Sequence, residues 1–296
     1  MDSADPVLEP LAPPRPSRLD ALIELLDDPS PSITETVKQA LLSGGREVEA
    51  PLKRAVKSDR PRIRARARGI LLTRDRRLSI RRLIGHATRP DIDLERALFL
   101  LGSLDRAGLD RRPYTRALDA MASQVRVEVD AAGDSSTAPM ALAEVLGTRM
   151  GFVGSEVDYD HPDNVYLHRA IERKRGMPLT LVALYLFVAR RAGIRATAVP
   201  LPGHVMCRIY SGERAYLVDP FHGGKLRTHE DCMRYLAMHE LTPKAAWFRD
   251  ASDRELFIRH VRNLMRSFDV RGRMDEARGL LDVARVLGKG LRAARR

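Results

Sequence analysis

An apolar run, Leu179–Ala189, constrains the fold of this chain more than any other feature of its sequence. A helix that is apolar around almost its whole circumference has to be enclosed by other elements, so the run predicts a central core helix over 179–191. Gly193 stands where a glycine is expected after a helix C-terminus. Because the run has about half the length of a membrane span, no membrane association is predicted.

The hydrophobic period changes from 3.6 to 2 directly after this helix, which indicates β-structure. Three strands are predicted, at residues 194–200, 204–210 and 215–219. We interpret Ser211-Gly212 as a two-residue hairpin turn between the last two. In that register His204 lies directly opposite Asp219, with Cβ atoms about 4.5–5.5 Å apart. The spacing therefore predicts a histidine held by an aspartate.

Helical patterns flank this core on both sides. Pro31 and Ile33 recur thirty residues later as Pro61 and Ile63, and each proline opens an amphipathic helix. Such a period resembles short HEAT-like repeats. We expect five segments: a disordered lead (1–16), a basic HEAT-like helical region (17–88), a helical region leading into the core (89–150), the core (151–248) and a tetratricopeptide-like helical hairpin (249–296).

The composition sets the class of protein. The chain has 296 residues, of which 44% are hydrophobic and 30% charged, a balance typical of soluble globular proteins. Two cysteines, Cys207 and Cys232, are too few for a disulfide framework or a thiolate zinc cage. The first residues lack a basic start and an apolar run, so no secretory signal is visible and a cytoplasmic protein is expected.

The positive charge is concentrated in one region. The formal net charge is +12, and residues 51–82 contain thirteen Lys or Arg but only two Asp. Such a surface can contact phosphates, so a nucleic-acid partner is one interpretation of this region. No aromatic side chain is interleaved to stack on bases. A solvated or partner-facing helix surface is therefore the preferred interpretation.

Four motifs have the order and spacing of a known family. They are Asp158-Tyr159-Asp160-His161-Pro162-Asp163-Asn164, Arg175-Gly176-Met177-Pro178, Pro202-Gly203-His204 and Asp219-Pro220-Phe221-His222-Gly223-Gly224. Over residues 90–290 the chain resembles the SirB-type transglutaminase-like family, whose members often carry a tetratricopeptide tail. The resemblance implies an α+β fold with a papain/transglutaminase-like core, in which one buried helix packs on an antiparallel sheet.

The resemblance also implies a catalytic arrangement that is incomplete here. Transglutaminase-like folds place a cysteine at the start of the core helix and a histidine and an aspartate on neighbouring strands. The helix N-terminus and the imidazolium lower the pKa of the thiol, and the carboxylate orients the imidazole. His204 and Asp219 match the last two residues, but Pro178 stands at the cysteine position. The SirB-type branch commonly has proline there, so the resemblance indicates a pseudoenzyme without thiol chemistry.

Other nucleophiles are weak candidates. Thr180 lies two residues into the core helix, but a threonine hydroxyl needs a well-placed base. Cys207 follows His204 by three residues on the same predicted strand, so alternation points it to the opposite face and favours a buried hydrophobic role. Cys232 falls in a short helix that begins after Thr228, and nothing in the sequence brings it to His204.

The remaining motif residues are expected to line or shape a cleft. They are Pro178, Tyr159, Asn164, Gly203, Phe221, Gly223 and Gly224. Tyr159 and Asn164 either hydrogen-bond the loop over the cleft or contact a ligand, and the paired glycines permit positive φ.

The histidines and aspartates of the motifs supply side chains of the kind that bind metals. They are His161, His168, His204 and His222, with Asp160, Asp163 and Asp219. No two of these histidines have the helical spacing that makes such a signal strong, so no metal and no cofactor are predicted.

Three functional hypotheses follow. The first is a transglutaminase-like protein that lacks the nucleophilic cysteine and acts as a peptide- or protein-binding or regulatory module. The second is an amide-bond hydrolase or acyltransferase in which His204, oriented by Asp219, activates water or Thr180. The third and weakest is a nucleic-acid-associated protein that works through residues 51–82.

Overall fold

The computed structural model describes residues 17–293, so the disordered lead predicted over 1–16 lies outside the described residues. The chain divides into two compact units, Met1–Arg76 and Arg77–Arg296. Across residues 17–293, no helix combines the length and the hydropathy that crossing a membrane requires.

The first unit is helical. It contains α1 (Arg18–Glu24), α2 (Pro31–Ser43), α3 (Glu49–Ala55) and the first part of α4 (Pro61–Ala87). Pro31 and Pro61 each open a helix, as the sequence pattern predicts. The helices enclose an apolar cluster of their own, to which α2 contributes Leu41, α3 Leu52 and α4 Ile63.

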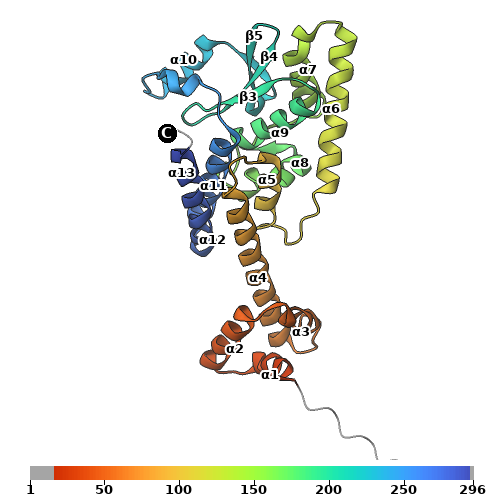
Figure 1. Cartoon of the computed structure of the whole chain (residues 1–296), viewed down its shortest axis with the longest axis vertical. Helices are drawn as coiled ribbons and strands as arrows, with labels where there is room; N and C mark the ends of the chain where they lie inside the picture. The colour runs from red at the N-terminus through yellow and green to blue at the C-terminus, as the bar shows by residue number, and fades with distance from the viewer. Residues whose placement is uncertain (1–16, 294–296) are drawn as a thin grey trace, which may run out of the picture. The chain divides into compact units, whose positions relative to one another are not determined.

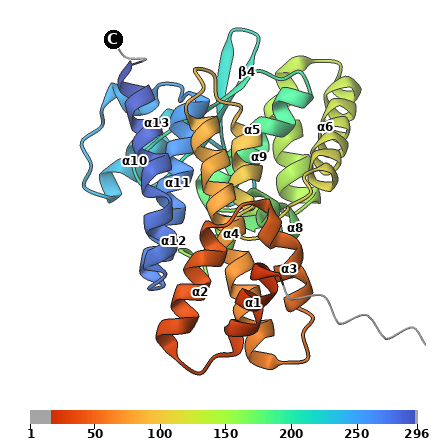
Figure 2. The same cartoon turned by 60° about the horizontal axis from the view of Figure 1, so that its bottom comes forward.

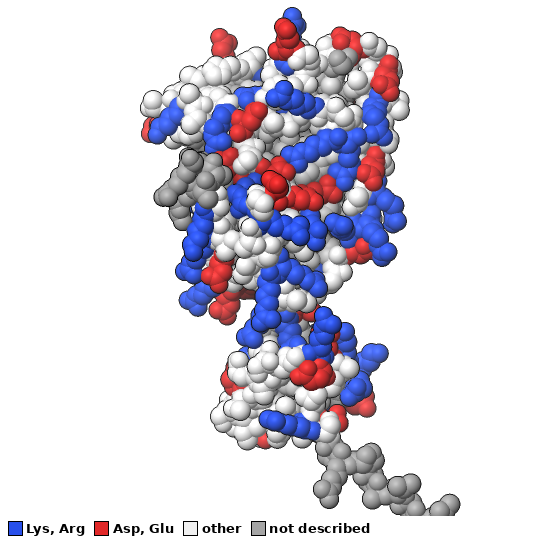
Figure 3. Space-filling view, viewed as in Figure 1, with Lys and Arg blue, Asp and Glu red and all other residues white. Residues whose placement is uncertain are grey.

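Part of the basic run serves this fold. Arg66 donates to the backbone carbonyl of Asp28 at 3.0 Å, and Arg74 donates to those of Leu41 at 2.8 Å and Gly44 at 2.7 Å. The carbonyls at a helix end lack partners within the helix, so these arginines complete the hydrogen bonding there. Other arginines of α4 are exposed, and basic side chains gather along this helix on the face shown in Figure 3.

The second unit combines helices with a small antiparallel sheet (Figure 1). Its helices are α5 (Leu94–Gly102), α6 (Arg112–Ala132), α7 (Ala138–Leu142), α8 (Leu167–Arg173), α9 (Pro178–Arg191), α10 (His229–Met238), α11 (Asp253–Val270), α12 (Met274–Gly279) and α13 (Leu281–Ala293). The sheet has the order β3 (Ala196–Val199), β4 (Met206–Ser211), β5 (Arg214–Asp219) and β6 (Lys225–Arg227). Two further short strands, β1 (Val153–Gly154) and β2 (Arg175–Gly176), pair in parallel. The predicted α+β class is confirmed.

Helix α9 is the centre of this unit. Every residue from Pro178 to Ala189 is buried, because α6, α8 and α11 and strands β3 and β4 all pack against it (Figure 2). Gly193 has φ +77° just after the helix, the left-handed conformation that terminates helices. The prediction of an enclosed core helix is confirmed.

The C-terminal helices belong to the same core. Leu256 and Leu264 of α11 and Leu287 of α13 lie in one apolar cluster with the buried residues of α9. Gly272 has φ +68° and separates α11 from α12.

The predicted hairpin turn is wrong by one residue. Ser211 pairs with Arg214 and Cys207 with Val218, so Gly212-Glu213 forms the turn rather than Ser211-Gly212. Gly212 has φ +58° at the first turn position, where tight hairpins favour glycine. His204 consequently lies before β4 and not directly opposite Asp219.

Candidate functional site

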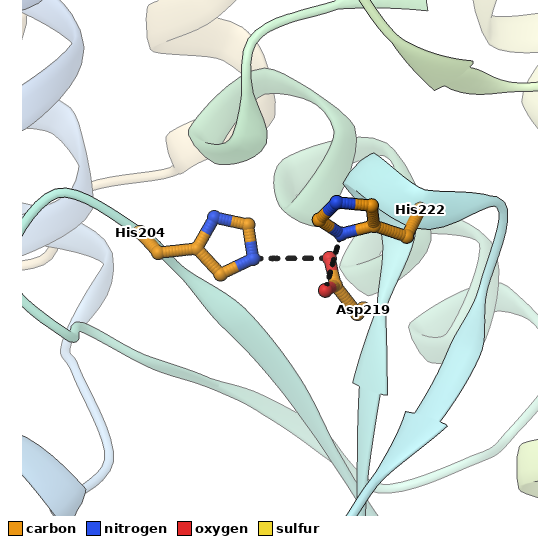
Figure 4. Close-up of side chains that lie close together, drawn as sticks. All are labelled: His204, Asp219 and His222. Atoms are coloured by element: carbon orange, nitrogen blue, oxygen red, sulfur yellow. Dashed lines mark hydrogen bonds and ion pairs between the residues drawn. The ribbon is translucent and has the colours of Figure 1, made fainter. Parts of the chain in front are cut away.

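A buried histidine–aspartate pair lies at one end of the sheet. The Nε2 atom of His204 donates to Oδ1 of Asp219 at 3.0 Å, and the two residues are 7% and 1% exposed (Figure 4). His204 precedes β4 by two residues, and Asp219 ends β5. With Nε2 as donor, Nδ1 of His204 keeps its lone pair and can accept a proton or a hydrogen bond.

The pair forms although the predicted register was wrong, for a simple geometric reason. Moving a two-residue turn by one position shifts the partner of every strand residue by two positions. A shift of two keeps each side chain on its own face of the sheet, whereas a shift of one would reverse it. His204 and Asp219 are therefore diagonal neighbours on one face, a separation that long side chains bridge.

A second histidine contacts the same carboxylate. Nδ1 of His222 lies 2.7 Å from Oδ2 of Asp219, and Arg227 donates its Nε to this oxygen at 3.2 Å. Burial opposes the ionised form of Asp219, but the hydrogen bonds and electrostatic attraction of His204 and His222 outweigh it and lower the pKa of Asp219 to about 2. The carboxylate is thus ionised at neutral pH, and two imidazoles point at it (Figure 4).

Aromatic rings frame the pair. The ring of Phe221 meets His204 edge to face with centroids 6.0 Å apart, and the ring of Tyr235 on α10 lies 5.7 Å from His204. Tyr159 continues this row by packing edge to face on Phe221 at 6.3 Å. Gly203 has φ +72°, and a Cβ there would lie 2.8 Å from the Tyr235 hydroxyl, so glycine allows α10 to approach the pair.

A cavity of about 210 Å³ opens beside the pair. Its walls include His204, Asp219 and His222, and α10 adds Tyr235 and Met238. Tyr235 and Met238 are not among the site residues predicted from the sequence. Thr228 and Asp231 form a capping box that marks the start of this helix, but no local signal tells which of its faces meets His204.

The structure gives the candidate nucleophiles other surroundings. Pro178 is the first residue of α9 and carries no dissociable proton. The Thr180 hydroxyl is fully buried and donates to the Val165 carbonyl at 3.2 Å. Cys207 and Cys232 are fully buried, and burial raises the pKa of both thiols, which disfavours thiolates. Among the described residues, no hydroxyl or sulfur atom forms a hydrogen bond with His204.

The other predicted cleft residues divide into two groups. Asn164 is buried and its side-chain amide donates to the carbonyls of Asp158 at 2.9 Å and Tyr159 at 3.1 Å, so it holds the loop that carries Tyr159. Gly223 and Gly224 both have positive φ. A Cβ on Gly224 would lie 2.8 Å from Cα of Ala143, so the turn after Asp219 packs directly on backbone.

Comparison with known proteins agrees with this architecture. The family model described as transglutaminase-like superfamily matches residues 112–262, about half of the chain. A UPF0162 protein of Xylella fastidiosa is 29% identical over 178 residues, which is 57% of this chain and 62% of that protein. A UPF0162 protein of Pseudomonas aeruginosa is 28% identical over 179 residues, 59% of this chain and 64% of that protein.

A eukaryotic protein matches a similar share of the chain. Human F-box only protein 21 is 30% identical over 182 residues, 59% of this chain but only 28% of that protein. The chain thus covers less than two thirds of the length of these curated relatives. No solved structure matches it.

Proposed function

This chain belongs to the transglutaminase-like superfamily, and we propose that it is a non-catalytic member that binds a peptide or protein partner in the cleft beside His204. The surroundings of the candidate nucleophiles carry the proposal. Proline begins the core helix, both thiols are buried with raised pKa, and the Thr180 hydroxyl is engaged by a backbone carbonyl. Thiol catalysis requires an accessible thiolate beside the imidazole.

The cleft has the composition of a binding surface. The ring of Tyr235 and the exposed side chain of Met238 offer apolar area, while His204 and His222 offer polar contacts. Ligand sites commonly combine such apolar walls with a few fixed polar groups. The match to F-box only protein 21 supports a modular role, because the shared segment is a minor part of that longer chain.

Two finer assignments belong to this proposal. The motifs around Pro178, His204 and Asp219 support an assignment to the SirB-type branch of the superfamily. Helices α11 to α13 then correspond to the tetratricopeptide-like tail of that branch; α11 packs against α9, and α13 contributes to the same apolar cluster. The basic helices of the first unit act as an additional interaction region.

Binding is tested by peptide selection on the full chain. Peptides selected from a displayed library are measured by fluorescence polarisation against the wild type and a matched pair of methionine variants. Met238 is 77% exposed and lines the cleft, and Met274 is 48% exposed in α12. We expect Met238→Ala to weaken binding at least about tenfold and Met274→Ala to leave it unchanged. Equal affinities for both variants, or no specific peptide, would overturn the cleft assignment.

Catalysis is tested separately with the same purified chain. Transamidation and peptidase substrates are incubated with the wild type and with His204→Ala. We expect no turnover above the background that His204→Ala shows. Turnover that disappears in His204→Ala would instead establish amide-bond chemistry with His204 as general base.

A further inference from the structure

Three side chains of the cleft bring metal-binding atoms together. One ring nitrogen each of His204 and His222 and a carboxylate oxygen of Asp219 all lie within 4.8 Å of one another. His204 lies just before β4, Asp219 is the last residue of β5, and His222 lies in the short turn after β5. Figure 4 shows that both imidazoles approach one carboxylate.

The chemistry of these donors points to a particular class of ion. Two neutral imidazoles and one carboxylate are a donor set that Zn²⁺ and other first-row transition metals use, and Ca²⁺ and Mg²⁺ prefer oxygen donors alone. Bond lengths of about 2.0–2.2 Å to zinc place neighbouring donor atoms roughly 3.4 Å apart in a tetrahedral site. The donor atoms of the three residues lie within 4.8 Å of one another, with His204 at 3.0 Å from Oδ1 and His222 at 2.7 Å from Oδ2, so modest rotations of the side chains bring them to that spacing.

Two arginines, Arg227 and Arg234, line the cavity and oppose a cation there, and Arg227 is the one that contacts Asp219. It contacts Oδ2 of Asp219 with Nε and Nη2, each at 3.2 Å, while Oδ1 has His204 as its hydrogen-bond partner. His222 also faces Oδ2, so a metal ion binds Oδ1 once the ring of His222 turns from Oδ2 towards it, while Arg227 continues to orient the carboxylate through Oδ2. Hydrogen bonds of this kind behind a metal ligand commonly fix its orientation.

From this geometry we propose that His204, Asp219 and His222 bind one divalent transition-metal ion, with Zn²⁺ as the preferred class. The inference goes beyond the peptide-binding proposal and does not depend on it. On metal binding, the ring nitrogen that donates to the carboxylate loses its proton to solvent or to the other ring nitrogen, and the lone pair freed in this way binds the metal. Three protein ligands leave a coordination position open towards the cavity, where water or a carboxylate of a bound partner fits.

The test uses the tag-free full chain after removal of metals with a chelator. Co²⁺ serves as the spectroscopic probe, because its visible absorption reports coordination number, and Zn²⁺ is then added as competitor. We expect one Co²⁺ ion per chain, displaced by Zn²⁺. His222→Ala should weaken binding at least about tenfold, since losing a group that only orients a ligand already costs 10–100-fold.

A nearby histidine provides the matched control. The ring of His239 lies 4.4 Å from that of Tyr235, in the same corner of the molecule, but it is not part of the donor cluster. His239→Ala should bind the metal like the wild type. His204→Gln provides a second ligand variant, and circular dichroism of each metal-free variant confirms folding. Absence of binding by the wild type at about 100 μM metal, or equal affinities for wild type and His222→Ala, would overturn the proposal.

Discussion

Two histidine–aspartate pairs in the larger unit make the same hydrogen bond in different surroundings. His204 donates to Asp219 and His168 donates to Asp105, and the donor–acceptor distance is 3.0 Å in both pairs. His168 is fully buried, and its ring lies near those of Tyr114 and Tyr166. His204 borders a cavity and has a second histidine beside its aspartate. A histidine–aspartate bond is therefore not a functional signal by itself, and the open space around it is what distinguishes the two pairs.

The electrostatics of the packed pair fit a structural role. Burial lowers the pKa of His168 by more than the Asp105 carboxylate raises it, so the imidazole is neutral at physiological pH. Its aspartate is also bound by Arg169 at 2.8 Å, which balances the negative charge. Such a pair links α8 to the segment after α5 and leaves no face for a ligand.

The largest expected effect separates the two pairs by stability. His168→Ala removes a fully buried ring, which leaves a cavity, and it also removes one hydrogen-bond donor to Asp105. Together these losses should lower the free energy of unfolding by about 3 kcal/mol. His204→Ala should cost about 1 kcal/mol, because water can enter from the adjacent cavity. Urea denaturation of both variants checks this. Equal losses would mean that the cleft pair is as structural as the packed one.

The next effect is a loss of stability in acid that comes from buried histidines. His260 in α11 is fully buried, and burial lowers its pKa to about 4. In the unfolded chain the pKa of a histidine is about 6.5. Between that pH and the pKa of His260 in the folded chain, the unfolded chain binds a proton at this imidazole and the folded chain does not. The contribution to stability is therefore present above pH 6.5 and is lost as the pH falls towards 4.

Urea denaturation at two pH values measures that contribution. From about pH 7 to about pH 4.5 the wild type should lose about 2 kcal/mol through this group, and His260→Gln should lose correspondingly less. The variant is compared with itself at the two pH values, so the cost of the substitution cancels. If the two chains show the same pH dependence, the proton uptake occurs at other residues.

The sequence predicted the elements of the core better than their exact pairing. The uniform apolarity of Leu179–Ala189 identified the enclosed helix, and the change of period identified β3 to β5. The hairpin turn was displaced by one residue because Ser211-Gly212 and Gly212-Glu213 both place glycine at a turn position. Because the turn error shifts each strand partner by two residues, His204 and Asp219 still lie on the same face of the sheet.

Other parts of the site depend on tertiary packing and had no local signal. Strand β6 spans only Lys225–Arg227, which is too short to show alternation. His222 reaches Asp219 through a short turn, and Tyr235 reaches His204 because α10 folds back beside Gly203. The pattern could predict that α10 exists, but not which of its faces lines the cavity.

A glycine beside the packed pair gives a smaller effect. A Cβ on Gly102 would lie 2.7 Å from Nδ1 of His168 and 2.8 Å from Cδ2 of Leu109. Gly102→Ala should therefore displace the buried ring and lower the free energy of unfolding by about 1 kcal/mol. Gly85→Ala in α4 is the matched control, because a Cβ there meets nothing within 4 Å. It should stabilise the chain by about 0.5–1 kcal/mol, since alanine favours helix. Thermal or urea denaturation measures both changes. If Gly102→Ala stabilises the chain as Gly85→Ala does, the ring of His168 can move freely.

Substitution of His222 should give the smallest change in stability. It also gives the sharpest test of the difference between the two histidine–aspartate pairs. Its side chain is 48% exposed, and Asp219 keeps His204 and Arg227 as partners when it is removed. In metal-free buffer His222→Ala should therefore change the free energy of unfolding by no more than about 0.5 kcal/mol, as urea denaturation will show. A loss as large as that of His168→Ala would assign His222 to the framework. A side chain that contributes so little to folding, yet points at a buried carboxylate beside a cavity, is instead positioned for a ligand.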